Sequence, residues 1–218
     1  SAEINPEYCG RLRERGLSVF CGDFLALDMS GLSQKPDVIF WWPMVAKAQN
    51  EVWLSHVRSQ ESYVSPECIV VIGFDHQHPP DMENREVMLT RYPEAEEHVI
   101  DFNEGQGPRM KGKFSLIHFH PQGSRGVIPS RVSNLSQRGI PTQSICSTLP
   151  DFSAVDTSPI RSPLLVADHL INLAAGGVVF EVGTRNGDIL SCISRFVNVT
   201  FSAEINPEYC GRLRERGL

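Results

Sequence analysis

A glycine-containing turn carries the strongest chemical signal in this sequence. Residues 181–187 read E-V-G-T-R-N-G and follow an apolar run that is typical of a buried strand. Glycines at such a turn let the backbone bend tightly and approach a ligand closely. Glu204 ends the next apolar run, 21 residues after Gly183. A carboxylate there can bind both hydroxyls of an adenosine ribose, so the pattern predicts a nucleoside-binding site.

Two kinds of nucleoside ligand compete for this turn. A dinucleotide site uses G-x-G-x-x-G, in which the middle glycine admits the pyrophosphate. Here Arg185 stands at the middle position, and the turn reads E-x-G-x-x-x-G instead. A third apolar run ends in Gly22-Asp23-Phe24, which adds a carboxylate near the same edge. The turn therefore favours a nucleoside ligand that carries no pyrophosphate.

An unchanged repeat links the two ends of the chain. Residues 1–17, SAEINPEYCGRLRERGL, recur as residues 202–218. The natural reading therefore starts near Ile160 and runs past the end of the chain into its beginning. The two copies compete for one place, and Glu204, which continues directly from its strand, is expected to bind the nucleoside rather than Glu3. The displaced copy could dock on a neighbouring molecule, which predicts a homo-oligomer.

The rejoined sequence resembles the class I methyltransferases, which use S-adenosylmethionine. The turn is similar to their motif I, and AEINPEYCGRLRERGLSVFCGDF is similar to their second and third motifs, over about 160 residues in all. The resemblance implies that residues 183–187 line the methionyl group, that Glu204 holds the ribose and that Ile205 flanks the adenine. It also implies that Asp23 and Phe24 bind the adenine amino group and ring. The implied cofactor-binding residues are Glu181, Gly183, Thr184, Arg185, Asn186, Gly187, Glu204, Ile205, Asp23, Phe24 and Trp41.

Two tryptophans end the expected fourth strand, in the sequence Trp41-Trp42-Pro43-Met44. Amino-methylating members of the family carry (N/D)-P-P-(Y/F) here, and its polar first residue and aromatic last residue orient a planar amine. This sequence keeps one proline, and Trp42 stands where Asn or Asp is expected. Because carboxyl ends of strands line the crevice in such sheets, a substrate-facing role competes with simple packing for both tryptophans. Trp42 is one of two candidate catalytic residues.

Histidines follow the expected fifth strand in Asp75-His76-Gln77-His78. A histidine at a strand end could act as a general base toward a hydroxyl or amine, and His76 is the second candidate catalytic residue. His118 and His120 form another H-x-H pair. Both rings of such a pair lie on one face of a strand, where they are often merely exposed, and we expect no bound metal.

Strands that alternate with helices must position these residues, and they predict an α/β fold. The expected strands are 178–181, 197–205, 18–21, 37–41 and 68–74, with 98–102 and 114–119 as an antiparallel pair. Helices are expected at 163–175, 188–196, 46–60 and 83–91, and after Asn206 as N-cap. The resemblance implies a Rossmann-like three-layer sandwich with a seven-strand, mostly parallel sheet and a circularly permuted chain order.

One methyltransferase-like domain is expected over residues 1–218. Residues 1–121 would hold strands 3 to 7, and residues 161–218 the first helix and strands 1 and 2. Residues 122–160 are rich in Ser, Pro, Arg and Gly and lack periodicity. Because a loop of this length is improbable inside a compact domain, we expect a linker there.

Composition limits the partners and the compartment. The net charge is −6, and an acidic balance argues against a nucleic-acid partner. No apolar run approaches the roughly 18 residues that span a bilayer, and the first residues do not resemble a signal peptide. Six cysteines without a C-x-x-C spacing suit reduced, mostly buried thiols. The expectation is a cytoplasmic protein without a membrane partner.

The combined observations predict methyl transfer from S-adenosylmethionine to an O or N nucleophile of a small-molecule or protein substrate. Positioning supplies much of the rate in such transfers, so no strongly recognisable catalytic residue is required. Two alternatives stay open. One is a catalytically silent methyltransferase-like binding module, and the other is an NAD(P)-dependent oxidoreductase that uses the same glycine turn.

Overall fold

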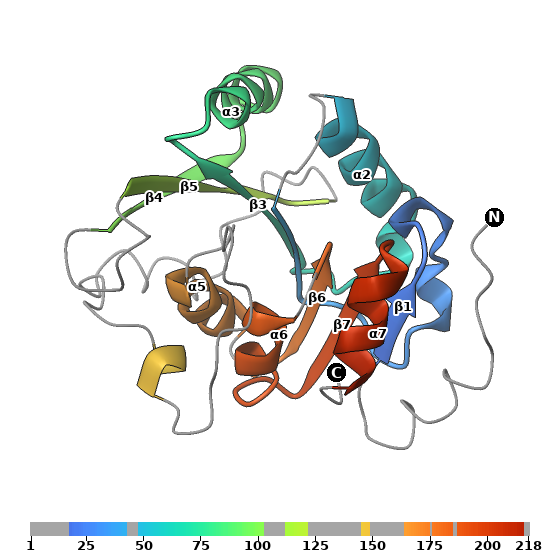
Figure 1. Cartoon of the computed structure of the whole chain (residues 1–218). Coiled ribbons are helices and arrows are strands. Elements are labelled where there is room, and N and C mark those ends of the chain that lie inside the picture. The colour runs from blue at the N-terminus through green and yellow to red at the C-terminus, as the bar shows by residue number, and fades with distance from the viewer. Residues whose placement is uncertain are drawn as a thin grey trace.

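Seven strands of the chain form one mixed sheet (Figure 1). The computed structural model describes residues 18–42, 48–102, 112–121, 145–148, 164–174, 176–184 and 187–215. The strands are β1 (Ser18–Cys21), β2 (Val38–Trp41), β3 (Ile69–Asp75), β4 (Glu96–Phe102), β5 (Gly112–Phe119), β6 (Val178–Val182) and β7 (Val199–Glu204). All pairs among β1, β7, β6, β2 and β3 are parallel. β5 pairs antiparallel with both β3 and β4, so β4 runs in the same direction as the five parallel strands.

The order of the strands in space is β1-β7-β6-β2-β3-β5-β4. The two strands that come last in the chain therefore lie between β1 and β2, which come first. Counted from β6, the order becomes 3-2-1-4-5-7-6, and its first five members match the doubly wound order of nucleotide-binding sheets. The α/β fold class and the seven-strand, mostly parallel sheet expected from the sequence are confirmed.

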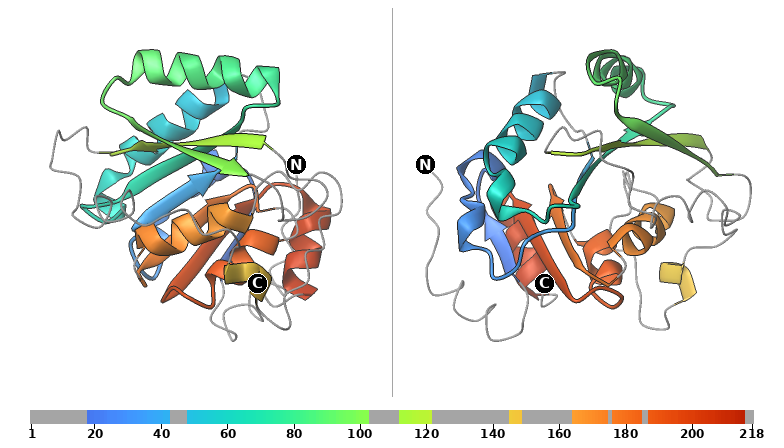
Figure 2. Two further views of the ribbon diagram at one scale, coloured as in Figure 1. Left: turned by 90° about the vertical axis from the view of Figure 1, so that its left-hand side faces the viewer. Right: turned by 180° about the vertical axis from the view of Figure 1, so that it is seen from behind.

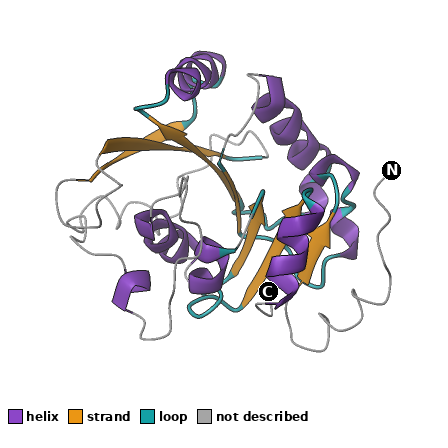
Figure 3. Ribbon diagram, viewed as in Figure 1, coloured by secondary structure: helices purple, strands orange, loops and turns teal. Residues whose placement is uncertain are grey.

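Helices cover both faces of the sheet (Figures 2 and 3). One face packs against α2 (Ala48–Ser59), α3 (Pro79–Arg91) and the short 3-10 turns η1 (Phe24–Ala26) and η2 (Met29–Gly31). The other face packs against α5 (Leu164–Ala174) and α6 (Asp188–Ile193). The remaining elements are η3 (Glu61–Tyr63), η4 (Ile145–Thr148) and α7 (Pro207–Glu215), which contacts β1 and β7. We call these two faces the α2–α3 face and the α5–α6 face.

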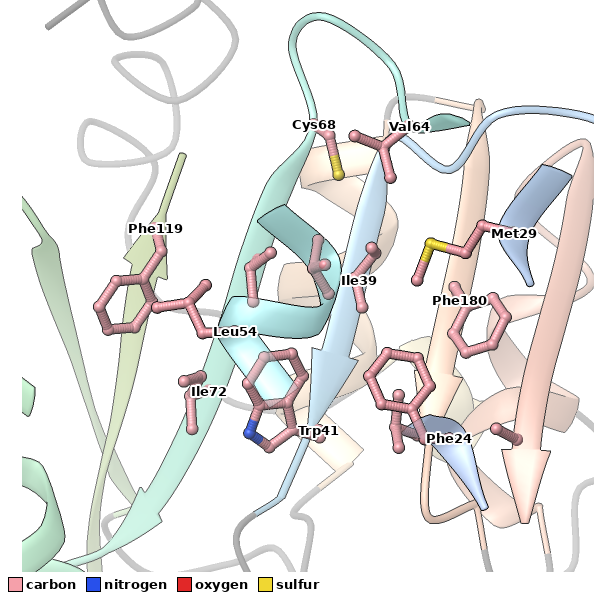
Figure 4. Close-up of a cluster of buried hydrophobic side chains, with 14 of the residues drawn as sticks. Phe24, Met29, Ile39, Trp41, Leu54, Val64, Cys68, Ile72, Phe119 and Phe180 are labelled. Atoms are coloured by element: carbon pink, nitrogen blue, oxygen red, sulfur yellow. The ribbon is translucent and has the colours of Figure 1, made fainter. Parts of the chain in front are cut away.

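The alternation of side chains along β2 shows how the core is divided. Val38 and Phe40 point to the α5–α6 face, whereas Ile39 and Trp41 point to the α2–α3 face (Figure 4). All four are at most 1% exposed. A strand that is buried on both faces needs a continuous apolar run, which is why these central strands carry no polar alternation.

The Asp37 carboxylate, just before β2, is hydrogen-bonded to the start of β6, so it joins an early and a late part of the chain. Asp37 Oδ2 accepts a hydrogen bond from the Val178 amide at 2.9 Å, although the two residues are 141 positions apart. A Cβ added to Gly177 would lie 2.3 Å from the same oxygen. Gly177 is therefore required by this close approach.

Several local predictions are confirmed in detail. Asn206 Oδ1 accepts a hydrogen bond from the Glu208 amide at 2.9 Å, which makes it the N-cap of α7.

Residues 202–215 of the second repeat copy form the end of β7 and α7, and residues 1–17 lie outside the described part. The linker predicted for residues 122–160 is described only at η4 and stays a prediction. No helix within the described residues is long and apolar enough to cross a membrane.

Candidate functional site

The carboxyl ends of β6, β7 and β1 lie side by side. Val182 pairs with Ala203, and Cys21 pairs with Glu204, so the glycine turn after β6 adjoins the end of β7 (Figure 1). α6 begins directly after the turn, at Asp188. Ligands bind at this edge of open α/β sheets, outside the carboxyl ends of the strands. The fold therefore brings the motif residues of the two late strands and of β1 to one place.

The turn itself is open toward solvent at its first glycine. Gly183 and Gly187 have φ angles of +77° and +76°, which a side chain would strain. A Cβ added to Gly183 would meet no atom within 4 Å. The Gly183 amide donates to the Ala203 carbonyl at 2.8 Å, and the Gly187 amide donates to the Thr184 carbonyl at 2.9 Å. These bonds fix the turn while its Gly183 face stays accessible to a ligand. Arg185 and Asn186 lie outside the described residues.

Two polar side chains lie beneath the turn on the α5–α6 face. Glu181 and Ser202 are neighbours across β6 and β7, and they are 5% and 0% exposed. Within the described residues, Ser202 Oγ has no hydrogen-bond partner. A buried hydroxyl without a partner is rare in folded proteins and marks a place where a polar atom could bind. The sequence analysis missed Ser202, since a serine in an apolar strand carries no motif.

Glu204 and Ile205 stand next to each other at the end of β7 with opposite exposure. Glu204 is 3% exposed, and its Oε1 accepts a hydrogen bond from the Asn206 amide at 2.8 Å. Ile205 is 67% exposed, which is unusual for a large apolar side chain. A fixed carboxylate beside an exposed apolar group suits a sugar and a flat base, respectively. The ribose and adenine roles of these residues stay predictions.

Three other residues of the implied cofactor site differ in where they point. Asp23 is exposed at the end of β1, and its Oδ1 accepts a hydrogen bond from the Leu25 amide at 3.0 Å. Phe24 is 3% exposed and packs against the rings of Trp53, His56 and Phe180.

Trp41 is fully buried and lies among the core side chains of the α2–α3 face (Figure 4). Its Nε1 donates a hydrogen bond to Asn50 Oδ1 at 3.0 Å. The structure thus packs both side chains into the core of the α2–α3 face, Trp41 through the alternation of β2 and Phe24 from η1.

The Trp42 ring packs over Gly73 in the neighbouring strand β3. It is 8% exposed, and a Cβ added to Gly73 of β3 would lie 2.3 Å from its ring. The ring also packs against Phe114 of β5, with centroids 5.7 Å apart. Trp42 therefore bridges three strands on the α5–α6 face. Pro43 and Met44 lie outside the described residues.

The His76 ring makes its contacts on the α2–α3 face, which is opposite to the face that holds Glu181 and Ser202. Its Nε2 lies 2.6 Å from Ser115 Oγ, and Ser115 is hydrogen-bonded to Glu97 in turn. Arg85 donates to both oxygens of Glu97 at 2.6 and 2.5 Å. Burial and the nearby Arg85 charge lower the pKa of His76. Although burial opposes it, the hydrogen bonds from Arg85 and Ser115 lower the pKa of Glu97. This network anchors the loop after β3 to β5 and β4.

Three further imidazoles form a cluster between the sheet edge and α5. His118 Nε2 lies 2.9 Å from His169 Nε2, and the rings of His98 and His118 are stacked with centroids 4.2 Å apart. Burial is the main cause that lowers the pKa of all three, and it lowers that of His169 to about 3. No group of three His, Cys, Asp or Glu residues in the described part could hold a metal ion.

A disulfide joins Cys146 of η4 to Cys192 of α6. The prediction of reduced thiols is therefore wrong for these two cysteines. Two cysteines 46 positions apart carry no spacing signature, so only the folded chain shows that they meet.

Comparisons with solved structures place the fold among methyltransferases. A candidate DNA modification methylase from Thermus thermophilus, in complex with S-adenosyl-L-methionine, has a TM-score of 0.53 and 14% identity over 92% of this chain and 93% of that chain. M1.HpyAVI has a TM-score of 0.53 and 11% identity over 92% and 98%. The PvuII DNA methyltransferase, which is cytosine-N4-specific, has a TM-score of 0.53 and 12% identity over 93% and 86%. No family model and no curated protein matches the sequence.

These likenesses show that the chain shares its fold with these methyltransferase structures, as the motif resemblance implied. They also contradict one prediction, namely that a nucleic-acid partner is disfavoured, because the similar structures are named as proteins that modify DNA. The error came from using the net charge of −6 as a guide. Net charge is a sum over the whole surface, whereas phosphate contacts depend only on the charges near the binding face.

Proposed function

We propose that this protein is an S-adenosylmethionine-dependent methyltransferase that acts on DNA. The observation that supports this most directly is the open turn at Gly183, which adjoins the fixed carboxylate of Glu204 and the exposed Ile205. The same fold occurs in a DNA modification methylase in complex with S-adenosyl-L-methionine. The nucleoside ligand predicted from the turn and the ligand of that relative agree.

The residues at the edge of the sheet fit this cofactor. Gly183 leaves space for a chain to pass over the backbone, and Ser202 Oγ offers a hydrogen bond beneath it. Glu204 would hold the ribose, Ile205 would flank the adenine, and Asp23 would bind the adenine amino group. When bound, the cofactor supplies an electrophilic methyl group.

The protein's own contribution to transfer would be mainly positional. Trp42 occupies the place where amino-methylating relatives carry Asn or Asp, and an indole buried against Gly73 and Phe114 offers no acceptor for a proton. His76 is held by Ser115 on the other face. Neither side chain has the geometry of a base at the turn, so orientation of the acceptor by the edge of the sheet would carry the rate.

Cofactor binding is tested by isothermal titration of the full chain with S-adenosylmethionine and S-adenosylhomocysteine. We expect binding in the micromolar range that Glu204→Ala weakens by about tenfold or more, as the loss of a charged hydrogen bond would do. Glu208→Ala is the matched control, because this exposed carboxylate lies four residues further along the same segment. Equal affinity of wild type and Glu204→Ala would refute the assignment of the site.

Transfer is tested separately, with radiolabelled S-adenosylmethionine and a DNA duplex of mixed sequence. Label in the DNA supports the full proposal. Cofactor binding without label would instead support a second candidate, a binding module that no longer transfers the methyl group. The burial of Trp42 at the motif position favours that candidate. Absence of cofactor binding would remove both.

A further inference from the structure

The Cys146–Cys192 disulfide closes a covalent loop that contains part of the candidate site. The two Cα atoms are 5.6 Å apart, and the loop between them contains α5, β6 and the glycine turn. Cys192 lies in α6, which begins one residue after Gly187. Every atom that β6 and its turn contribute to the site therefore lies inside this loop.

The bond is buried, and the element on one side of it, η4, is short. Cys146 and Cys192 are both 0% exposed, whereas Ile145, the neighbour of Cys146, is 42% exposed. η4 is four residues long, and its Ile145 amide donates to the two carboxylate oxygens of Asp168 in α5 at 3.1 and 3.3 Å. Local opening of this short turn would expose the sulfurs without unfolding of the sheet.

Two buried thiols in the described residues, Cys68 and Cys210, are poor partners for exchange. Burial, followed by the charge of Asp37, raises the pKa of Cys68, which suppresses its reactive thiolate. Cys210 Sγ donates to the Glu204 carbonyl at 3.2 Å and is buried. Among the buried cysteines of the described residues, Cys146 and Cys192 are therefore the pair best suited to thiol–disulfide exchange.

We propose that the Cys146–Cys192 disulfide is a redox-controlled tether that holds the glycine turn in its ligand-binding form, an inference that rests on the proposed cofactor site. A dithiol reductant supplies the two electrons and two protons. One of its thiolates attacks a sulfur of the disulfide, and its second thiol then releases the mixed disulfide. The protein gains two thiols, the reductant becomes a disulfide, and η4 is no longer bound to α6.

Hydrogen exchange of the full chain, oxidised and then reduced with dithiothreitol, tests the tether without any cofactor. We expect amides of α5, β6 and α6 to exchange about tenfold faster after reduction, while those of β3 change little. The double variant Cys146→Ala/Cys192→Ala should behave like the reduced protein with or without reductant, and Cys21→Ala should respond like wild type. Identical exchange in oxidised and reduced wild type would overturn the proposal.

Titration of both forms with S-adenosylmethionine tests the link to the site. We expect reduction to weaken binding by about fivefold or more, in the usual range of coupling between sites. Faster exchange together with unchanged affinity would overturn control of the turn. If the oxidised protein binds no cofactor, the proposed function fails, and the exchange experiment still decides whether the disulfide orders this segment.

Discussion

The imidazole cluster of His98, His118 and His169 should make the fold sensitive to acid. The folded-state pKa of His169 is about 3, well below the value of about 6.5 in an unfolded chain. The folded state therefore binds fewer protons, and its stability is present above about pH 6.5 and is lost as the pH falls toward 3. Replacement of His169 by Phe removes this titration and keeps a ring between α5 and the sheet.

The expected magnitude follows from linkage. A single group with these two pKa values loses about 2 kcal/mol of stability between pH 8 and pH 5. The residue His169 is not fully buried, so solvent screening reduces the figure to about 1–2 kcal/mol. At pH 8 His169→Phe should be less stable than wild type by about 1 kcal/mol, because His118 Nε2 loses its partner. The difference should vanish or reverse by pH 5.

Urea unfolding at a series of pH values between 5 and 8 measures this directly. The free energies of unfolding of wild type and His169→Phe should converge as the pH falls. Val87→Ala, at an exposed side chain of α3 that carries no titrating group, is the control and should run parallel to wild type. Parallel curves for His169→Phe would refute the argument that the cluster is held neutral by the fold.

Three more predictions concern the edge of the sheet and the chain ends. Gly183→Val should abolish detectable cofactor binding in calorimetry and lower stability by about 1–2 kcal/mol, because φ is +77° and the new side chain fills the open face. Gly73→Ala should destabilise the fold by about 1–3 kcal/mol in urea unfolding, and Trp42→Leu should restore part of the loss, since the added Cβ strikes that ring. Deletion of residues 1–17 should leave thermal unfolding unchanged, because residues 202–215 already form the end of β7 and α7.

Local patterns in the sequence were sufficient for the sheet and for the conformation of the turn and strand end that we propose as the centre of the site. The turn at Gly183 was predictable because a glycine between a buried strand and a helix is typical of a tight turn with positive φ. Glu204 was predictable because a carboxylate at the end of an apolar run is conspicuous. The N-cap Asn206 was predictable from its position before Pro207.

The direction of side chains at the strand ends was harder to predict. A shift of one position along the chain at the end of a strand turns a side chain from the ligand edge to a helix layer. Phe24 and Trp41 both point to the α2–α3 face. The role of Trp42 depended on Gly73, a residue of another strand whose missing side chain leaves room for the indole. The meeting of Cys146 and Cys192 depends on the placement of α5 and α6, which no local pattern encodes.

The position of β6 and β7 in the middle of the sheet also constrains how the protein is made. During synthesis, β1 and β2 emerge early, yet each must wait for a neighbour from the last part of the chain. Until then both strands have an open edge that could pair with another nascent chain. Contacts such as Asp37 with Val178 span 141 positions and form late, which slows folding. Productive folding should therefore depend more on the completed synthesis of β6 and β7 than in a protein whose central strands come first.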